Sequence, residues 1–276
     1  MMIACNDNMA ISIRIVLNRY GLDIFGFCHF DDLFGRLLPC RAARRLPRNP
    51  RSVIVVLFPY YVNVEGARNV ARYVIPDDYH IIAGGILAEA AASLHKIYPK
   101  EEFATFIDDS PIPEKYAAHL AGLGFIGRHS QLINREFGAY VFIGTIVTTM
   151  ATAPSEPVRN ICLDNCAKCI ESCPTGAISR DKPFERSLCL SAISQKKALT
   201  SWEEQQMRRA GIVWGCDICL EACPLNILAR ESPIDAFKNS SSPWIDPENI
   251  DEIWPRKAYN YRPKEVLLRN YYLTTE

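Results

Sequence analysis

The spacing of the cysteines constrains this chain more than any other feature of its 276 residues. Eight of the eleven cysteines lie between residues 162 and 223, in two runs that share the unit C-x2-C-x3-C-P. Four thiolates at such spacings can surround a [4Fe–4S] cubane, and in bacterial two-cluster ferredoxins the last cysteine of each run binds the other cluster. The repeated unit therefore predicts two clusters whose ligands are shared between the runs.

The expected ligand sets follow from that signature. The first run reads C-x3-C-x2-C-x3-C-P and ends at Pro174, and the second follows an isolated cysteine and ends at Pro224. The first gap of three residues is one longer than usual. We expect a looser loop there without loss of the ligand. The first cluster is predicted to take Cys162, Cys166, Cys169 and Cys223, and the second Cys173, Cys189, Cys216 and Cys219.

Two other uses of these cysteines are weaker. Zinc sites also bind thiolates, but zinc ribbons pair C-x2-C knuckles and do not need the C-P ending. Disulfide frameworks belong to small secreted domains, and the start of this chain shows no export signal. Cys5, Cys28 and Cys40 receive no role. The net charge is zero and no uncharged stretch is long enough to span a bilayer, so we expect a cytoplasmic protein without membrane contact.

The cysteines also divide the chain into an α/β (α+β) part and a ferredoxin-like part. Residues 1–155 alternate apolar helical patterns with β-branched strands, and residues 156–230 hold both cysteine runs. Residues 231–276 are polar and contain several prolines, which predicts an irregular tail. The expected helices are 8–20, 78–98, 113–124 and 201–209, the last with a capping box from Ser201 to Glu204, and the expected strands are 22–28, 52–58, 103–107 and 140–147.

Taken in order, six segments resemble the epoxyqueuosine reductases: GLDIFGF, PRSVIVVLFPYY, DYH, AGLGFIG, CAKCIESCPTGAI and WGCDICLEACPLN. The resemblance runs from about residue 21 to about residue 226. That family consists of cobalamin-dependent oxidoreductases with two [4Fe–4S] clusters, related to reductive dehalogenases, which reduce epoxyqueuosine to queuosine in tRNA. The resemblance implies that the N-terminal part binds a corrinoid, and that the clusters deliver electrons to it one at a time.

The same resemblance implies the site residues. The family's proton-donor stretch maps onto residues 108–115, which makes Asp108 the expected general acid. Opening an epoxide leaves an alkoxide, and a carboxylic acid whose pKa is raised by an apolar cavity can protonate it. Alternatively, Asp108 and Asp109 cap the following helix. The residues expected to face the corrinoid or the substrate are Asp78, Tyr79, His80 and Arg128.

Two departures from the family concern the substrate more than the cofactors. The AGLGF segment is followed by Gly127, Arg128 and His129, where the family has Gly-Lys-Asn. This change keeps the positive charge and alters its geometry. The region between Phe30 and Arg51 is also shorter than usual.

Two basic segments could contact RNA. Residues 35–51 carry six arginines and no acid, and residues 255–272 mix basic residues with tyrosines. Arginine suits phosphate contact, and aromatic rings suit base stacking. Solvated faces on a neutral protein explain both segments equally well, so the sequence leaves tRNA binding open.

The first hypothesis is therefore an iron–sulfur, cobalamin-dependent reductase of epoxyqueuosine in tRNA, supplied by an electron donor such as ferredoxin or flavodoxin. A second is a ferredoxin-like electron-transfer protein that has lost the substrate chemistry. A third is a corrinoid reductase that acts on a substrate other than tRNA. Retention of a corrinoid separates the second hypothesis from the others, and only an assay separates the first from the third.

Overall fold

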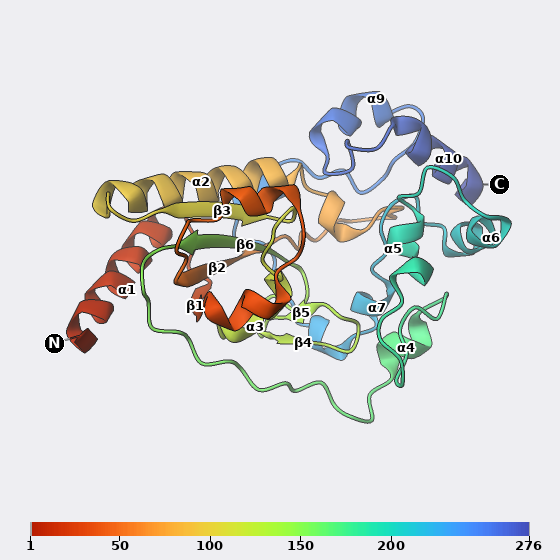
Figure 1. Ribbon diagram of the computed structural model, residues 1–276. Coiled ribbons are helices and arrows are strands. Elements are labelled where there is room, and N and C mark those ends of the chain that lie inside the picture. The colour runs from red at the N-terminus through yellow and green to blue at the C-terminus, as the bar shows by residue number, and fades with distance from the viewer. Residues whose placement is uncertain (1, 276) are drawn as a thin grey trace.

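A four-stranded antiparallel sheet forms the centre of the N-terminal part (Figure 1). The computed structural model describes residues 2–275, with side chains from residue 10 onward. The strands lie in the order β1-β2-β6-β3, and every neighbouring pair is antiparallel. The strand bounds are β1 Phe25–His29, β2 Ser52–Pro59, β3 Phe103–Ile107 and β6 Val141–Thr148, with a separate pair of short strands, β4 Phe125–Ile126 and β5 Leu132–Ile133.

Strand β2 is buried on both faces because each face packs against a different layer. All eight of its residues are buried, as its run of β-branched side chains predicts. Ile54 belongs to one apolar cluster with α1 (Met2–Arg19) and α2 (Tyr79–Ile97). Its neighbour Val53 belongs to a second cluster with α3 (Glu114–Leu120). Successive side chains alternate between the two layers because a strand has a period of two.

The predicted helices and strands of the N-terminal part are present, with shifted ends. Helix α1 starts at Met2, six residues earlier than predicted, and β1 starts at Phe25, three residues later. The capping box of α6 (Ser201–Ala210) lies one residue earlier than predicted, with Thr200 as the N-cap and Glu203 as its partner. Thr200 has the extended backbone that an N-cap requires, whereas Ser201 is already helical.

Short helices carry the cysteine runs. Figure 1 shows α4 (Lys168–Ser172), α5 (Leu190–Ile193) and α7 (Ile218–Glu221) beyond the sheet, on the side away from α1. The chain reaches them through residues 151–163, which contain neither helix nor strand. The N–H of Ser155 donates to the carbonyl of Phe27 at 2.9 Å and so holds the start of this linker against β1.

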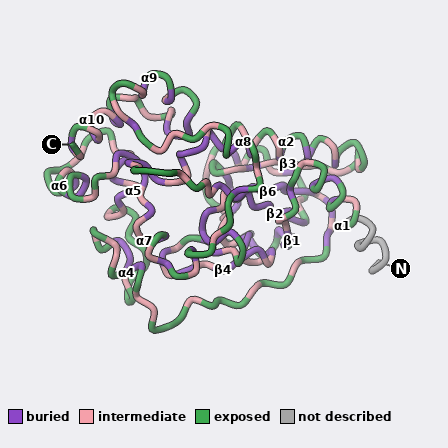
Figure 2. Tube along the Cα trace, turned by 180° about the vertical axis from the view of Figure 1, so that it is seen from behind, coloured by how far each residue is buried: buried purple, intermediate pink, exposed green. Residues whose placement is uncertain are grey.

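The prediction of an irregular tail over residues 231–276 is wrong. This segment contains α8 (Asp235–Lys238), α9 (Ile250–Ile253) and α10 (Lys264–Thr275), and α10 packs against α6. Figure 2 shows buried residues along this part of the trace, and Leu267 is fully buried. The apolar residues of α10 are interrupted by charged and tyrosine side chains. Its stability therefore depends on packing that the local pattern does not reveal.

Lys257 fastens this C-terminal segment to the start of α2. Its side chain is fully buried, and its Nζ donates to the carbonyl oxygens of Ile75 at 2.6 Å and Ser240 at 3.1 Å. The same ammonium lies 3.2 Å from Asp77 Oδ1. The next residue, Asp78, donates its backbone N–H to the carbonyl of Arg256 at 2.8 Å. The C-terminal segment therefore helps to position the turn that begins α2.

Replacing Lys257 by methionine is expected to lower the free energy of unfolding by about 2–4 kcal/mol, because two buried carbonyls and a carboxylate lose their partner. The measurement is urea denaturation of the reconstituted protein under anaerobic conditions. Lys238→Met is the matched control. It removes an exposed ion pair with Asp235, and is expected to change stability by less than about 0.5 kcal/mol. Equal effects of the two substitutions would contradict this role of Lys257.

Candidate functional site

The first predicted group of cysteines comes together from both runs. Cys169 lies in α4 and Cys223 follows α7, and both are buried. Burial, and then the nearby thiols of Cys162, Cys223 and Cys166, raises the pKa of Cys169. Burial followed by Cys162 and Cys166 likewise raises the pKa of Cys223. One cysteine of the second run therefore lies with three cysteines of the first.

The second predicted group surrounds one small cavity of about 30 Å³ beside Pro174. Burial raises the pKa of Cys216 to about 12, and the neighbouring Cys189 and Cys173 add to this effect. All ten described cysteines are free thiols. The residues of the group that line the cavity are Cys173, Cys189, Cys216 and Cys219.

Each group of thiols fits a metal cluster by its chemistry. Thiols that raise one another's pKa need nearby positive charge to ionise, and the iron of a [4Fe–4S] cubane supplies that charge while taking four thiolate ligands. Within residues 10–275, no three His, Cys, Asp or Glu side chains converge on a position that could hold a single metal ion. The two groups of neighbouring cysteines agree with the crosswise ligand sets, which stay a prediction.

The residues that follow the C-P ending of the first run supply hydrogen-bond donors to the sulfur of Cys173. Backbone N–H groups that follow Pro174, first among them that of Thr175, donate to the sulfur of Cys173. Burial acts to raise the pKa of Cys173, but these hydrogen bonds lower it overall. The hydroxyl oxygen of Thr175 also lies 3.7 Å from the sulfur. A thiolate at this position is surrounded by donors of the kind that tune a cluster ligand.

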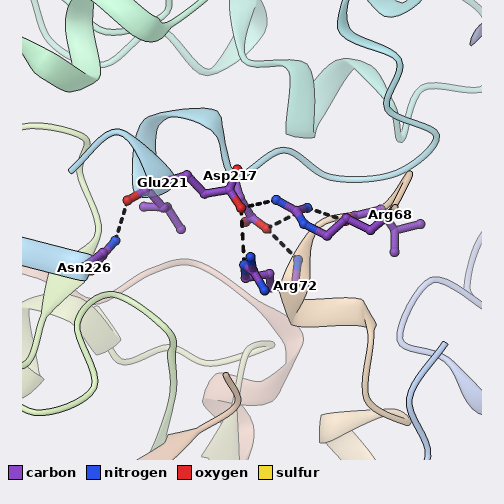
Figure 3. Close-up of polar contacts among 7 residues, drawn as sticks. Arg68, Arg72, Asp217, Glu221 and Asn226 are labelled. Carbon is purple, nitrogen blue, oxygen red and sulfur yellow. Dashed lines mark hydrogen bonds and ion pairs between the residues drawn. The ribbon is translucent and has the colours of Figure 1, made fainter. Parts of the chain in front are cut away.

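Asp217 fastens the second cysteine run to the N-terminal part (Figure 3). Its carboxylate accepts the backbone N–H of Arg72 at 2.6 Å and lies 3.5 Å from the guanidinium of Arg68. Glu221 pairs with both arginines, 3.3 Å from Nε of Arg72. Only 3% of the Asp217 side chain is exposed, so removing its partners would leave a buried charge. This network holds the loop between Cys216 and Cys219 against the rest of the protein.

A larger cavity of about 260 Å³, open to solvent, adjoins the second cysteine group. Cys189, Cys216 and Cys219 form part of its wall. Tyr79 and Phe142 stack with their ring centroids 3.9 Å apart in another part of the wall. Apolar cavities with a few polar groups are the usual binding sites of small molecules. The aromatic residues that line this cavity are Tyr60, Tyr73, Tyr79, Phe142 and Phe184.

Tyr79 connects the cavity to a chain of charged residues at the start of α2. The Tyr79 hydroxyl donates to Asp108 Oδ2 at 3.0 Å, and His80 Nε2 lies 3.3 Å from the same oxygen. His80 Nδ1 lies 2.7 Å from Oδ1 of Asp78, which also caps α2 by accepting the His80 N–H. The predicted general acid and the predicted DYH triplet therefore form one hydrogen-bonded chain.

Asp108 reaches this chain through an unusual backbone conformation. Directly after β3 it adopts a left-handed conformation with φ of 58°, which aspartate tolerates better than most residues. Such conformations cost about 1–3 kcal/mol and cluster at functional sites. Asp108 does not cap the next helix, since α3 begins at Glu114 with Pro113 as its N-cap and no side-chain cap. The alternative role of Asp108 and Asp109 as caps is wrong.

The protonation of this chain differs from the expectation for Asp108. The hydrogen bond from His80, together with one from Tyr79, lowers the pKa of Asp108 although burial opposes the shift. Burial acts to lower the pKa of His80, but hydrogen bonds to Asp108 and Asp78 outweigh it and raise that pKa to about 9. An imidazolium therefore lies between two carboxylates at neutral pH. The expected rise at Asp108 is wrong because two donors and solvent, rather than an apolar wall, contact its carboxylate, whose side chain is 67% exposed.

Glu114 has the property that was expected of Asp108. Burial, and then the charge of Asp108, raises the pKa of Glu114 well above its usual range. The Oε1 atom of Glu114 is buried and has no hydrogen-bond partner among the described residues. Both observations indicate a neutral carboxylic acid beside Asp108. Glu114 lies in the same predicted proton-donor stretch, residues 108–115, but the sequence does not show its burial.

Arg128 is not among the residues that line the cavity, whereas its neighbour His129 is. Arg128 donates from Nη2 to the carbonyl of Asp164 at 3.2 Å, so it contacts the first cysteine run. His129 is 3% exposed and lines the cavity. Its Nδ1 accepts the N–H of Gln131 at 3.2 Å, and burial lowers its pKa to about 4. The proton of this neutral ring is therefore on Nε2, which has no partner among the described residues.

Residues 162–226 match the family described as "4Fe-4S double cluster binding domain". This segment contains both cysteine runs and the isolated cysteine between them. The match confirms the prediction of a double-cluster domain in this part of the chain.

Curated epoxyqueuosine reductases are similar to most of this chain. The protein of Cyclobacterium marinum is 29% identical over 208 residues, which cover 73% of this chain and 64% of that protein. The protein of Gloeobacter violaceus is 33% identical over 173 residues, which cover 61% of this chain and 54% of that protein. The matched part thus amounts to less than two thirds of either relative. These similarities confirm the resemblance that the motifs predicted.

Solved structures confirm the fold. The structure of an epoxyqueuosine reductase with an epoxyqueuosine-modified stem loop of tyrosine tRNA matches with a TM-score of 0.81. The match covers 99% of this chain and 81% of that one, at 19% sequence identity. The predicted α/β (α+β) part followed by a two-cluster part is therefore the arrangement of known epoxyqueuosine reductases.

Proposed function

We propose that this protein is an iron–sulfur, cobalamin-dependent reductase that converts epoxyqueuosine to queuosine in tRNA. One observation carries the proposal: the cavity wall contains three cysteines of the second group and Tyr79, which donates to Asp108. Removing an epoxide oxygen as water consumes two electrons and two protons. The cavity is where electrons from a cluster and protons from acidic residues could meet. The names of the similar proteins support the choice of substrate.

The residues that are present fit both cofactors. Each cysteine group offers four thiols to one [4Fe–4S] cluster. The aromatic wall of the cavity suits a large planar ring, and the unpartnered Nε2–H of His129 suits an amide carbonyl of the kind that a corrinoid carries. When bound, the corrinoid would supply a strongly reducing metal centre for cleavage of the carbon–oxygen bond.

The charged chain at the start of α2 would supply protons. An oxygen that leaves carbon becomes basic and must be protonated, a step for which a positioned acid contributes about 10²- to 10⁴-fold in rate. His80 holds its proton at neutral pH and bonds directly to Asp108, which would pass it on. Glu114, neutral and next to Asp108, would supply the second proton. Tyr79 and Asp78 would hold the two ends of the chain in place.

The partners follow from the proposed reaction. The substrate is tRNA, and the clusters take single electrons from a carrier such as ferredoxin or flavodoxin. A reaction on tRNA would take place in the cytoplasm. None of the described helices has both the length and the apolar character needed to cross a bilayer.

The proposal is tested with anaerobically reconstituted protein, cobalamin, a one-electron reductant and an epoxyqueuosine-modified tRNA stem loop. We expect queuosine to form, by mass spectrometry of the nucleosides, only when cobalamin and reductant are both present. Turnover is expected to fall as pH rises through about 9, because His80 then loses its proton, and to be retained below that pH.

Other outcomes would favour the other hypotheses. If the protein retains cobalamin but leaves the stem loop unchanged, a reductase for another substrate is favoured. If it retains no cobalamin but its reduced clusters rapidly reduce a partner protein, the ferredoxin-like electron-transfer role is favoured.

A further inference from the structure

The arginine segment, residues 36–51, forms a basic surface on the N-terminal part. All six of its arginines are exposed, and no acidic residue occurs between Leu33 and Arg51. These arginines are Arg36, Arg41, Arg44, Arg45, Arg48 and Arg51. This local excess of positive charge, on a chain whose net charge is zero, would attract a polyanion to the arginine segment.

No described acidic side chain neutralises the positive charge of this segment, although Arg45 donates to the carbonyl of Thr105 at 3.3 Å. None of the six arginines forms an ion pair with any described residue. Arg36 stacks 4.5 Å from the ring centroid of Tyr116, and Arg45 stacks 4.6 Å from that of Phe106. Stacking fixes the plane of a guanidinium and leaves N–H groups along its edge for a phosphate.

The second basic segment that the sequence suggested for RNA differs in this respect. Lys257 is buried against Asp77, and Lys264 pairs with Asp251. Arg269 donates to the carbonyl oxygens of Lys196 and Lys197 at 2.9 and 2.8 Å. These cations hold the C-terminal segment in place. Each of them already contacts a carboxylate or carbonyl oxygen of the protein.

The arginine segment lies against the loop that carries Asp108. The N–H of Leu38 donates to the carbonyl of Pro111 at 2.8 Å, and three residues of chain span at most about 11 Å. Tyr116, on which Arg36 stacks, follows Glu114 by two residues in α3. The side chain of Phe34 is 71% exposed beside the segment and offers a ring on which a base could stack.

We propose that residues 36–51 bind the phosphate backbone of the RNA substrate and hold it next to Asp108; this inference rests on the proposed function. An acidic electron carrier is the other polyanion that such a surface could attract. Its electrons must reach the cysteine groups, which Figure 1 shows beyond the sheet, whereas the arginine segment adjoins the proton-donating loop. The position therefore favours RNA.

The test compares two triple substitutions in the reconstituted protein. One changes Arg41, Arg44 and Arg48 to glutamine and leaves the two stacked arginines in place. The control changes Arg135, Arg159 and Arg209, also exposed, to glutamine and removes the same charge elsewhere. The probe is a fluorescently labelled, epoxyqueuosine-modified tRNA stem loop, titrated at several salt concentrations.

We expect the first variant to bind the stem loop about 10- to 100-fold more weakly at 0.1 M salt. The slope of log K against log salt should become shallower by about 2, because each lost phosphate contact removes about 0.7–0.9. The control should bind like the wild type. At saturating stem loop the first variant should keep the wild-type turnover, so that only KM rises.

Three results would overturn the proposal: unchanged binding by the first variant, equal weakening in the control, or slower reduction by flavodoxin with unchanged RNA binding. Failure of the proposed function gives a different pattern. In that case the wild type would bind the stem loop through these arginines but would produce no queuosine.

Discussion

Replacing Asp108 by asparagine is expected to lower turnover of the epoxyqueuosine stem loop by about 10²- to 10⁴-fold, the usual contribution of a positioned proton donor. The substitution removes the carboxylate that accepts from both Tyr79 and His80, so the proton of His80 loses its route to the cavity. Asparagine tolerates the left-handed backbone at this position. The loss should therefore appear in kcat, with both clusters and the corrinoid retained in the absorption spectrum.

Asp109→Asn is the matched control, because it removes the same charge one residue away. Asp109 is exposed and lies outside the hydrogen-bonded chain that joins Tyr79, Asp108 and His80. Its turnover should stay within about twofold of the wild type. A fully active Asp108→Asn variant would remove Asp108 from the reaction. Equal losses in the two variants would point to the charge of the loop instead.

The second large effect is expected from the cysteines at the ends of the two runs. Replacing Cys223 by alanine should disrupt the first cluster, although Cys223 belongs to the second run, and Cys173→Ala should disrupt the second cluster. Each variant should lose about four of eight irons. Turnover should fall to background in both, because each cluster is a step in the supply of electrons.

Spectroscopy of the remaining cluster identifies which one was lost. The electron paramagnetic resonance spectrum of reduced Cys223→Ala should match that of Cys162→Ala and differ from that of Cys216→Ala. Cys40→Ala, which changes a free thiol outside both groups, should match the wild type. If Cys223→Ala instead resembles Cys216→Ala, the ligands are paired within each run and the crosswise assignment fails.

The spacing of the cysteines alone predicts the two ligand sets, and the structure brings members of each set near one another. The sequence also predicts the main strands, because a continuous run of β-branched residues such as that of β2 indicates a strand covered on both faces. The C-terminal helix α10 is missed because its buried face includes the polar Asn270 and depends on contact with α6. Local patterns thus predict elements that are stable in many contexts, and miss those that depend on one partner.

Within the site, residue types are predicted better than their protonation. The motifs select Asp108 and the DYH triplet, and the structure joins them in one chain. The pKa values depend on burial and on partners distant in sequence, so the raised pKa falls on Glu114 rather than Asp108. His129 could have been noticed because it departs from the family's Gly-Lys-Asn, but its unpartnered Nε2 is visible only in three dimensions.

The most direct test of this account is the metal content of the wild-type protein, purified and reconstituted without oxygen. Two cubanes shared between the cysteine runs require about eight irons and about eight acid-labile sulfides per chain. Added cobalamin should then remain bound through gel filtration at about one per chain. Zinc in place of iron, with no labile sulfide, would contradict the clusters and the electron supply that the proposed reaction needs.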